Sequence, residues 1–205
     1  MATEITTHDA SSKESKFLRR FHVENYEMLT WTIVFGIIGA LLVTFLMLIP
    51  FPYVMVTLFK FGLVLPLAFI ALVGAIRGPI AGMLSGYLGM LLYDLVASGA
   101  FVGFTLPAAS YGVLGFIVGL GVYDFENGRS LGKLSILATV GLLFTSLLIL
   151  LLALTIQDYA VLAAIGFVFL PLLTTGLPSV IILTPVLARI WFMIMNRFLP
   201  QYMPT

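Results

Sequence analysis

The sequence has no cysteine and very little charge. Its 205 residues exclude disulfides and thiolate metal sites, because there is no Cys to form either. Charged residues make up 9% of the chain, whereas a soluble domain carries about a quarter. The only histidines, His8 and His22, precede the first apolar run, so no imidazole is available inside the apolar segments. We therefore expect no metal and no cofactor.

Long apolar runs take the place of the missing charge. The chain is 61% hydrophobic and has a mean hydropathy of +1.15. A helix needs about 20 apolar residues to cross a bilayer, and several runs here reach that length. The first run is too long for the core of a signal peptide, so we expect it to be retained. We predict an all-α integral membrane protein with a six-transmembrane-helix bundle.

The predicted spans follow from the apolar runs and their polar or proline-rich breaks. We expect a polar N-terminal tail (1–27), a single membrane domain (28–198) and a C-terminal tail (199–205). The six spans are predicted at 29–49, 61–76 (with a start near Tyr53 as an alternative), 78–97, 105–122, 134–156 and 176–196. The ten apolar residues 161–170 are too few to cross alone, so we expect a short re-entrant or interfacial element on the outer side. A seventh span and an extension of the last span over residues 157–175 are the alternatives.

The distribution of Lys and Arg predicts the orientation. Cytoplasmic loops of membrane proteins carry an excess of basic residues. With six spans and both termini in the cytoplasm, only Lys60 falls on the outer side. The other basic residues then lie inside: four in the N-terminal tail, followed by Arg77, Arg129, Lys133, Arg189 and Arg197. We expect a multi-pass protein of the plasma membrane.

Small residues recur at helical spacing in three of the predicted spans. In lipid, helices associate through small faces that allow close backbone approach. We therefore assign a helix-packing role to the glycines of spans three and four, namely Gly78, Gly82, Gly86, Gly89, Gly115 and Gly119. Gly36 and Ala40 in span one form a similar pair, and we expect this pair to face another protein.

Two charged residues flank the third span. Arg77 and Asp94 are 17 residues apart, about 25 Å along a helix, so they cannot pair within it. Arg77 fits an anchor at the cytoplasmic boundary. Asp94 is the only acidic residue within an apolar span, and two interpretations stay open: contact with interfacial water, or a role in a pocket.

Other polar side chains fall on the same outer side as Asp94. Lys60 lies among aromatic and aliphatic residues, where it either snorkels to lipid headgroups or contributes to a pocket. A few polar groups in an apolar, aromatic wall are typical of small-molecule sites. The candidate substrate-binding residues are Tyr53, Lys60, Tyr93, Asp94, Gln157, Asp158 and Tyr159.

The sequence offers little for catalysis. It has no Ser/His/Asp arrangement and no paired carboxylates at helical spacing. The loop "GRSLGKL" (128–134) differs from a phosphate-binding loop in its glycine spacing, in the Leu after the Lys and in lacking a preceding strand. We expect no enzymatic activity, no ATP hydrolysis by the chain itself and no nucleic-acid partner.

Several segments together resemble a transporter family. The run from "IPFPYVMVTLFKFG" through "LVGAIRGPIAGMLSGYLGMLLYDLV" is similar to the substrate-binding S components of energy-coupling-factor (ECF) vitamin transporters. "FTLPAASYGVLGFIVGL" and "GLPSVIILTPVLARI" also look similar, so the resemblance covers most of residues 30–195.

The resemblance implies a mechanism. An S component captures a vitamin or related micronutrient from outside, with its first outer loop as a lid, and delivers it through a separate transmembrane coupling subunit with two ATPase subunits. Gly36 and Ala40 match the small residues that contact the coupling subunit, although many members have Ala at both positions. Lys60, Asp94 and the outer tyrosines become ligand candidates. Metal cargo is not expected, since no His lies in the first few residues.

Two other classes remain. A structural or scaffold membrane protein, which assembles other subunits and has no ligand of its own, would use its glycine faces for oligomerisation. An intramembrane enzyme acting on lipids is disfavoured by the missing acid/base pair, and lipid turnover that depends on Asp94 would reverse that view.

Overall fold

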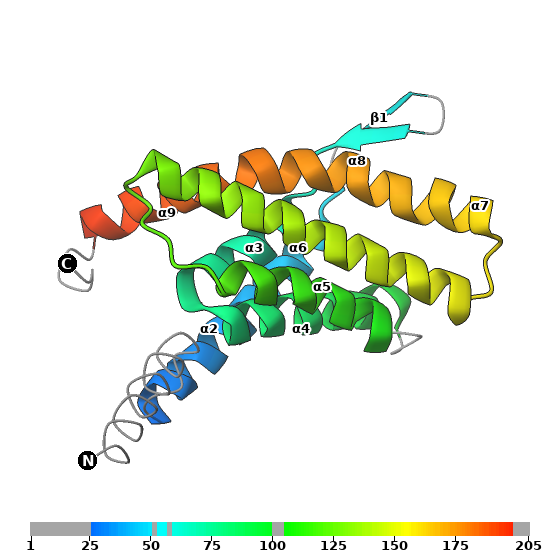
Figure 1. The fold of residues 1–205 in the computed structure, drawn as a ribbon. Coiled ribbons are helices and arrows are strands. Elements are labelled where there is room, and N and C mark those ends of the chain that lie inside the picture. Colours follow the sequence, from blue (N-terminus) through cyan, green and yellow to red (C-terminus); the bar gives the residue numbers. More distant parts are fainter. Residues whose placement is uncertain (1–25, 51–52, 57–58, 100–104, 199–205) are drawn as a thin grey trace, which may run out of the picture.

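The computed structural model describes residues 26–50, 53–56, 59–99 and 105–198. Within these ranges the chain forms helices α2 (Tyr26–Leu48), α3 (Leu65–Arg77), α4 (Pro79–Ser98), α5 (Thr105–Gly119) and α6 (Gly128–Thr155), and then one last long helix (Figure 1). A hairpin of two strands, β1 (Tyr53–Val56) and β2 (Phe59–Gly62), connects α2 to α3. Residues 1–25 and 199–205, most of the two predicted tails, lie outside the described residues.

The described helices are those of a multi-pass membrane protein. Four of them are long and apolar enough to cross a bilayer: Tyr26–Leu48, Pro79–Ser98, Gly128–Thr155 and Val161–Phe198. The other two, α3 and α5, are apolar but shorter. The predicted helical membrane class is therefore confirmed, whereas six full-length spans are only partly borne out. At 13 residues α3 extends about 20 Å, less than the roughly 30 Å of a hydrocarbon core.

The hairpin corrects the predicted start of the second span. We expected a helix from residue 61, with Tyr53 as an earlier alternative, but residues 53–62 pair as antiparallel strands with Met55 opposite Lys60. The β-branched and aromatic residues in "YVMV" and "FKFG" favour strands. The helix begins only at Leu65, where Pro66 occupies its first turn, a position that proline tolerates because its missing N–H is not needed there.

The last helix corrects the prediction of a separate outer element at 161–170. It runs without a break from Val161 to Phe198 through α7 (Val161–Ala163), a π-helical segment η1 (Ala164–Phe169), α8 (Leu170–Pro178), a second π-helical segment η2 (Ser179–Leu183) and α9 (Thr184–Phe198). Each π-helical segment adjoins a proline-containing turn. A widened turn makes room for a proline ring, which would clash with a carbonyl in a regular helix.

The predicted fifth span also starts earlier than expected, at Gly128 instead of residue 134. Asn127 caps this helix, because its side chain accepts a hydrogen bond from the Arg129 amide at 3.0 Å. The polar loop that we expected before the span therefore contributes the first turns of α6.

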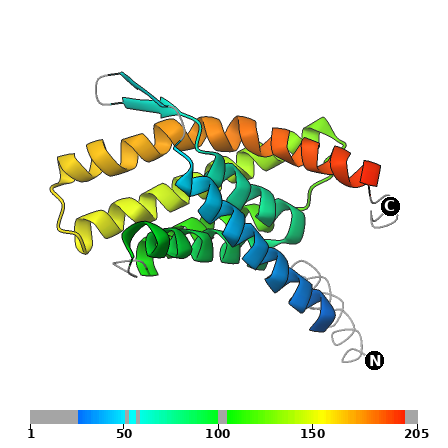
Figure 2. The same ribbon diagram turned by 180° about the vertical axis from the view of Figure 1, so that it is seen from behind.

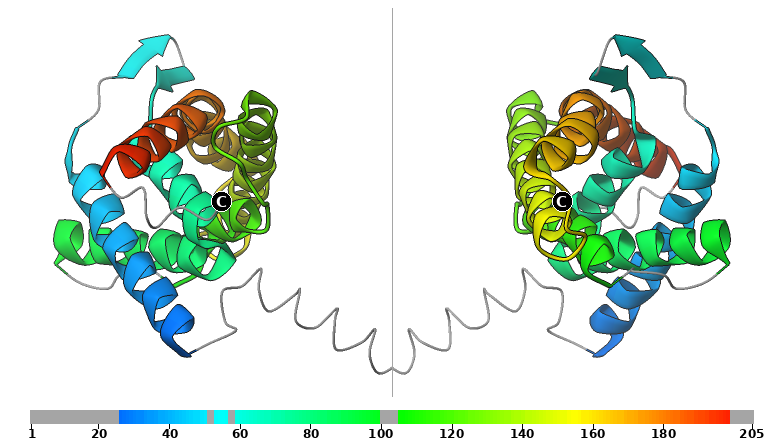
Figure 3. Two further views of the ribbon diagram at one scale, coloured as in Figure 1. Left: turned by 90° about the vertical axis from the view of Figure 1, so that its left-hand side faces the viewer. Right: turned by 90° about the vertical axis from the view of Figure 1, so that its right-hand side faces the viewer.

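Helix α3 is the centre of the bundle. Figure 3, which looks along the bundle, shows α3 surrounded by α2, α4, α5, α6 and α9. Its side chains Leu67, Ile70 and Ala71 are fully buried, and they pack with Leu114 and Leu142 from α5 and α6. The core is therefore built around the shortest helix.

The connections between helices lie at two opposite ends of the bundle. The start of α2, the α3–α4 and α5–α6 connections and the end of α9 lie at one end, on the left in Figure 1 and on the right in Figure 2. The α6–α7 turn lies at the other end, and the hairpin also lies toward that side. In our predicted orientation the first of these two ends would face the cytoplasm and the second would face the outside.

Candidate functional site

Asp94 lies near the C-terminal end of α4, half-buried and facing α5. It is close enough to the Tyr111 side chain of α5 for the two groups to interact electrostatically. Two features of the sequence bring them together. Gly86 lets the α5 backbone approach α4 at Tyr111, and side chains on a helix tilt toward its N-terminus, which for α5 is the end where Asp94 lies. Tyr93, also half-buried, is the neighbouring residue on α4.

Tyr53 and Lys60 belong to the two strands of the hairpin. Strand β2, which carries Lys60, packs against α8 of the last helix. The root of the hairpin is fixed there, because the Val64 amide donates a 2.6 Å hydrogen bond to Ser179 Oγ. The backbone of Lys60 is therefore positioned over the last helix, whereas Asp94 faces α5.

Gln157, Asp158 and Tyr159 form the exposed turn between α6 and the last helix. Asp158 has a left-handed backbone conformation, with φ at 50°, and the Tyr159 amide donates to the Ala153 carbonyl at 3.1 Å. The seven candidate binding residues thus fall in three places: the α4–α5 contact, the hairpin above α8 and this turn.

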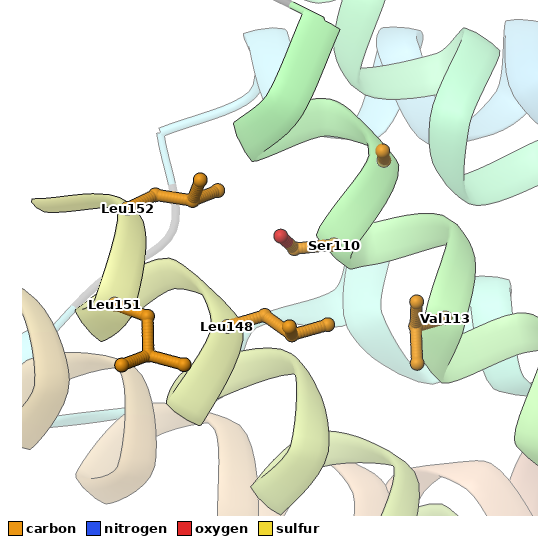
Figure 4. Close-up of a pocket in the computed structure, with 6 residues that line it drawn as sticks. Ser110, Val113, Leu148, Leu151 and Leu152 are labelled. Carbon is orange, nitrogen blue, oxygen red and sulfur yellow. The ribbon is translucent and has the colours of Figure 1, made fainter. Parts of the chain in front are cut away.

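A pocket that sequence reasoning missed lies between α5 and α6. It has a volume of about 220 Å³ and is lined by Ala109, Ser110, Val113, Leu148, Leu151 and Leu152 (Figure 4). None of the predicted binding residues lines it. The sequence signal was weak, because its lining residues are the ordinary small and apolar residues of membrane helices.

The spaced glycines lie at helix crossings. A Cβ added at Gly82 or Gly115 would meet the backbone of the other residue, so α4 and α5 touch backbone to backbone there. Gly119 is similarly close to Pro79. Gly89 lies on a different side of α4, where an added Cβ would lie 2.8 Å from Val43 of α2. Gly78 has a φ of 90°, which favours glycine, and it makes the sharp turn from α3 into α4.

Gly36 and Ala40 differ from the expectation that they face another protein. Both are buried, and a Cβ added at Gly36 would lie 2.9 Å from Leu84 Cβ of α4. The Ala40 carbonyl is likewise close to Gly89 of α4. These two residues therefore pack inside the chain, and a partner could reach them only if α2 moved away from α4.

The opposite end of the bundle is rich in basic residues and has an ordered connection. Arg189 of α9 donates to the carbonyls of Phe125 and Glu126 at 2.9 and 3.2 Å, and Lys133 donates to the Val122 carbonyl at 3.3 Å. Tyr123 donates to the Val118 carbonyl at 2.7 Å, and burial raises the pKa of its hydroxyl above the ordinary value. These contacts tie the α5–α6 connection to α6 and α9.

Arg77 lies at the same basic end, where α3 meets α4. Its side chain is half-buried, and within the described residues its Nε is buried without a hydrogen-bond partner. Its predicted role as an anchor at the cytoplasmic boundary stays a prediction. Because Asp94 lies 15 residues after the first residue of α4, the two charged residues are separated by most of the length of that helix, about 23 Å.

The described residues contain no group of three or more His, Cys, Asp or Glu side chains that could hold a metal ion. The fold is that of a multi-pass helical membrane protein. Its described residues form a small apolar pocket between α5 and α6 and include one half-buried carboxylate, that of Asp94. Comparisons with known protein families, with characterised proteins and with solved structures found no match.

Proposed function

We propose that this chain is the substrate-binding membrane subunit of an ATP-driven, ECF-type importer in the plasma membrane. It captures a vitamin or related small micronutrient from outside and delivers it through a transmembrane coupling subunit with two ATPase subunits. The observation that carries the proposal is the half-buried Asp94, a carboxylate within an apolar helix and in electrostatic range of Tyr111. Charged groups inside membrane helices usually have a functional role, because their burial is unfavourable.

The orientation belongs to the same proposal. The basic residues Arg77, Lys133 and Arg189 lie at one end of the bundle, which we assign to the cytoplasm. Asp94 is then near the outer end, where a captured solute arrives. The hairpin with Lys60 lies toward the same end, over the last helix, and would close over the ligand.

The proposal gives Lys60 and Asp94 distinct roles. Lys60 pairs with a carboxylate or phosphate of the ligand, and Asp94 accepts a hydrogen bond from a polar ligand group. Hydrogen bonds to charged groups contribute about 1.5–3 kcal/mol, which is about 10- to 100-fold in affinity. Tyr53, Tyr93, Gln157, Asp158 and Tyr159 are the further candidates around them.

Ligand binding by the purified protein in lipid nanodiscs tests the proposal. Mass spectrometry of the gently purified protein identifies the co-purifying small molecule, and its affinity is then measured for the wild type, Lys60→Ala and Asp94→Asn. We expect each variant to bind about 10- to 100-fold more weakly. Asp124→Asn at the basic end is the matched control and should bind as the wild type does. Unchanged affinity in both test variants would show that the site assignment is wrong.

A scaffold protein without a ligand of its own is the second candidate. It is favoured by the division of the seven polar candidates among three places and by the apolar lining of the described pocket. In that case no small molecule co-purifies, whereas partner subunits do. The same mass spectrometry therefore separates the two functions.

A further inference from the structure

The pocket between α5 and α6 begins just beyond a hydrogen bond that ties the two helices together. Thr145 Oγ1 of α6 donates to the Ser110 carbonyl of α5 at 2.9 Å. One turn further along α6, Leu148 points toward Val113 across the open space (Figure 4), and Ala109 also lines the pocket. The Thr145–Ser110 contact therefore joins the two helices beside the pocket, since Ser110 itself is one of the lining residues.

The lining decides the chemistry of an occupant. Five of the six lining residues are aliphatic, and none is charged. Ser110, which carries the one hydroxyl, already interacts within the chain. A charged or strongly polar group in this pocket would lose its hydration without gaining partners, which is unfavourable by several kcal/mol. Only a hydrocarbon surface suits these walls.

The volume limits the size of the occupant. An apolar cavity of about 150 Å³ is known to bind benzene or xenon, whereas pockets for drug-sized ligands have about 300–1,000 Å³. At about 220 Å³, this pocket accommodates one ring or a short stretch of alkyl chain. It is too small for a whole vitamin-sized molecule.

The mouth of the pocket faces the apolar surroundings of the bundle. Leu151 is 48% exposed and Ala109 is also exposed, and both belong to apolar helices. Asp94 does not reach this space through Tyr111, because Ser110 and Tyr111 point about 100° apart on α5. The pocket is thus separate from the carboxylate discussed above.

We propose that the α5–α6 pocket binds an uncharged hydrocarbon group, either one ring or a short segment of alkyl chain. The group has two sources, an acyl chain of a bilayer lipid or the apolar end of a small solute. The proposal does not depend on the transport function, since the walls and volume of the pocket carry it alone.

Photolabelling in nanodiscs tests this assignment with three probes. The first is phosphatidylcholine with a diazirine in one acyl chain, the second is trifluoromethylphenyl diazirine, and the third is the benzoate derivative of the second. After irradiation, peptide mapping compares labelling of residues 109–113 and 148–152 with labelling around Val140, an exposed position on α6 outside the pocket. We expect selective labelling of the pocket by an uncharged probe and none by the benzoate.

Two matched variants show whether the label reports the pocket. Val113→Phe fills the space and should reduce pocket labelling to the level around Val140, whereas Val140→Phe should leave it unchanged. Ala109→Leu narrows the mouth and serves as the test variant if Val113→Phe does not fold.

Selective labelling by the lipid probe supports the bilayer as the source, and selective labelling by the phenyl probe alone supports a solute. The proposal is overturned if no uncharged probe labels the pocket above the surface around Val140. It is also overturned if the benzoate labels the pocket equally, or if filling the pocket leaves the label in place.

Discussion

The first half of the bundle, from α2 to α5, and the second half, α6 with the last helix, are held together by different kinds of contact. From α2 to α5 the helices approach until backbones touch at glycines, as Gly82 and Gly115 do. In the second half, hydroxyl groups bridge to neighbouring segments: Ser135 donates to the Ile181 carbonyl at 3.0 Å, and Ser179 accepts from the Val64 amide. The most apolar stretch of the last helix is 17% buried, against 39% in α2. The last helix therefore leaves more of its surface to lipid or to partners than α2, α4 or α6 does.

Gly82→Ala tests this difference with the largest expected effect. A Cβ at residue 82 would lie 2.6 Å from the Gly115 carbonyl carbon, and no flexible side chain can give way there. Overpacking of this kind is unfavourable by about 1–3 kcal/mol or more. We expect a clear loss of thermal stability of the purified protein in detergent.

Gly132→Ala is the matched control for that substitution. Gly132 lies in the first turns of α6, and an added Cβ would meet nothing within 4 Å. Alanine favours helix over glycine by about 1 kcal/mol, so the same change should stabilise the protein. Equal effects at residues 82 and 132 would contradict the assignment of backbone contact to the first half.

The difference between the halves also explains which features the sequence predicted. Glycines at four-residue spacing carry a direct packing signal, so the contact faces of α4 could be expected. The π-helical segments could not, because they depend on how Pro171, Pro178 and Pro185 are accommodated by neighbouring helices. Ten apolar residues at 161–170 suit either a separate element or part of a longer helix, and only tertiary packing decides between them.

The candidate site shows the same limit. Asp94 stands out in the sequence as the one acidic residue of an apolar run, and its neighbour Tyr111 follows once α4 and α5 are paired. The α5–α6 pocket could not be predicted, since an empty volume depends on the relative position of two helices and not on a residue type. The sequence also did not predict that Gly36 is buried against α4. The spacing of small residues indicates a contact face but does not say which helix packs against it.

Ser179→Ala tests the second half, with a smaller expected effect. Ser179 is fully buried, donates to the Thr175 carbonyl at 2.7 Å and accepts from Val64. Without the hydroxyl the Val64 amide has lost its acceptor, which is unfavourable by about 1–3 kcal/mol. We expect lower thermal stability together with faster hydrogen exchange at the root of the hairpin, and Ser179→Thr should restore much of both.

Ser146→Ala is the control, because Ser146 is equally buried but donates only to carbonyls of its own helix. Those carbonyls keep the helical environment when the hydroxyl is removed. If Ser146→Ala and Ser179→Ala lower the stability equally, and exchange at the hairpin root is unchanged, then the Val64 contact does not fix the hairpin to the last helix.

Thr145→Val tests the boundary between the halves, and here we expect the smallest change. The substitution keeps the shape of the side chain and removes the hydrogen bond to the Ser110 carbonyl. Hydrogen bonds between membrane helices contribute about 0.6 kcal/mol on average, so the thermal stability should fall only slightly. Thr139→Val removes a comparable hydrogen bond that stays within α6, to the Ser135 carbonyl. This variant should lower the thermal stability less. Because the Thr145 bond joins α5 to α6 beside the pocket, its loss should also increase photolabelling at residues 109–113, and Thr139→Val should leave that labelling unchanged. An unchanged labelling pattern in Thr145→Val would show that the Thr145 bond does not set the width of the gap.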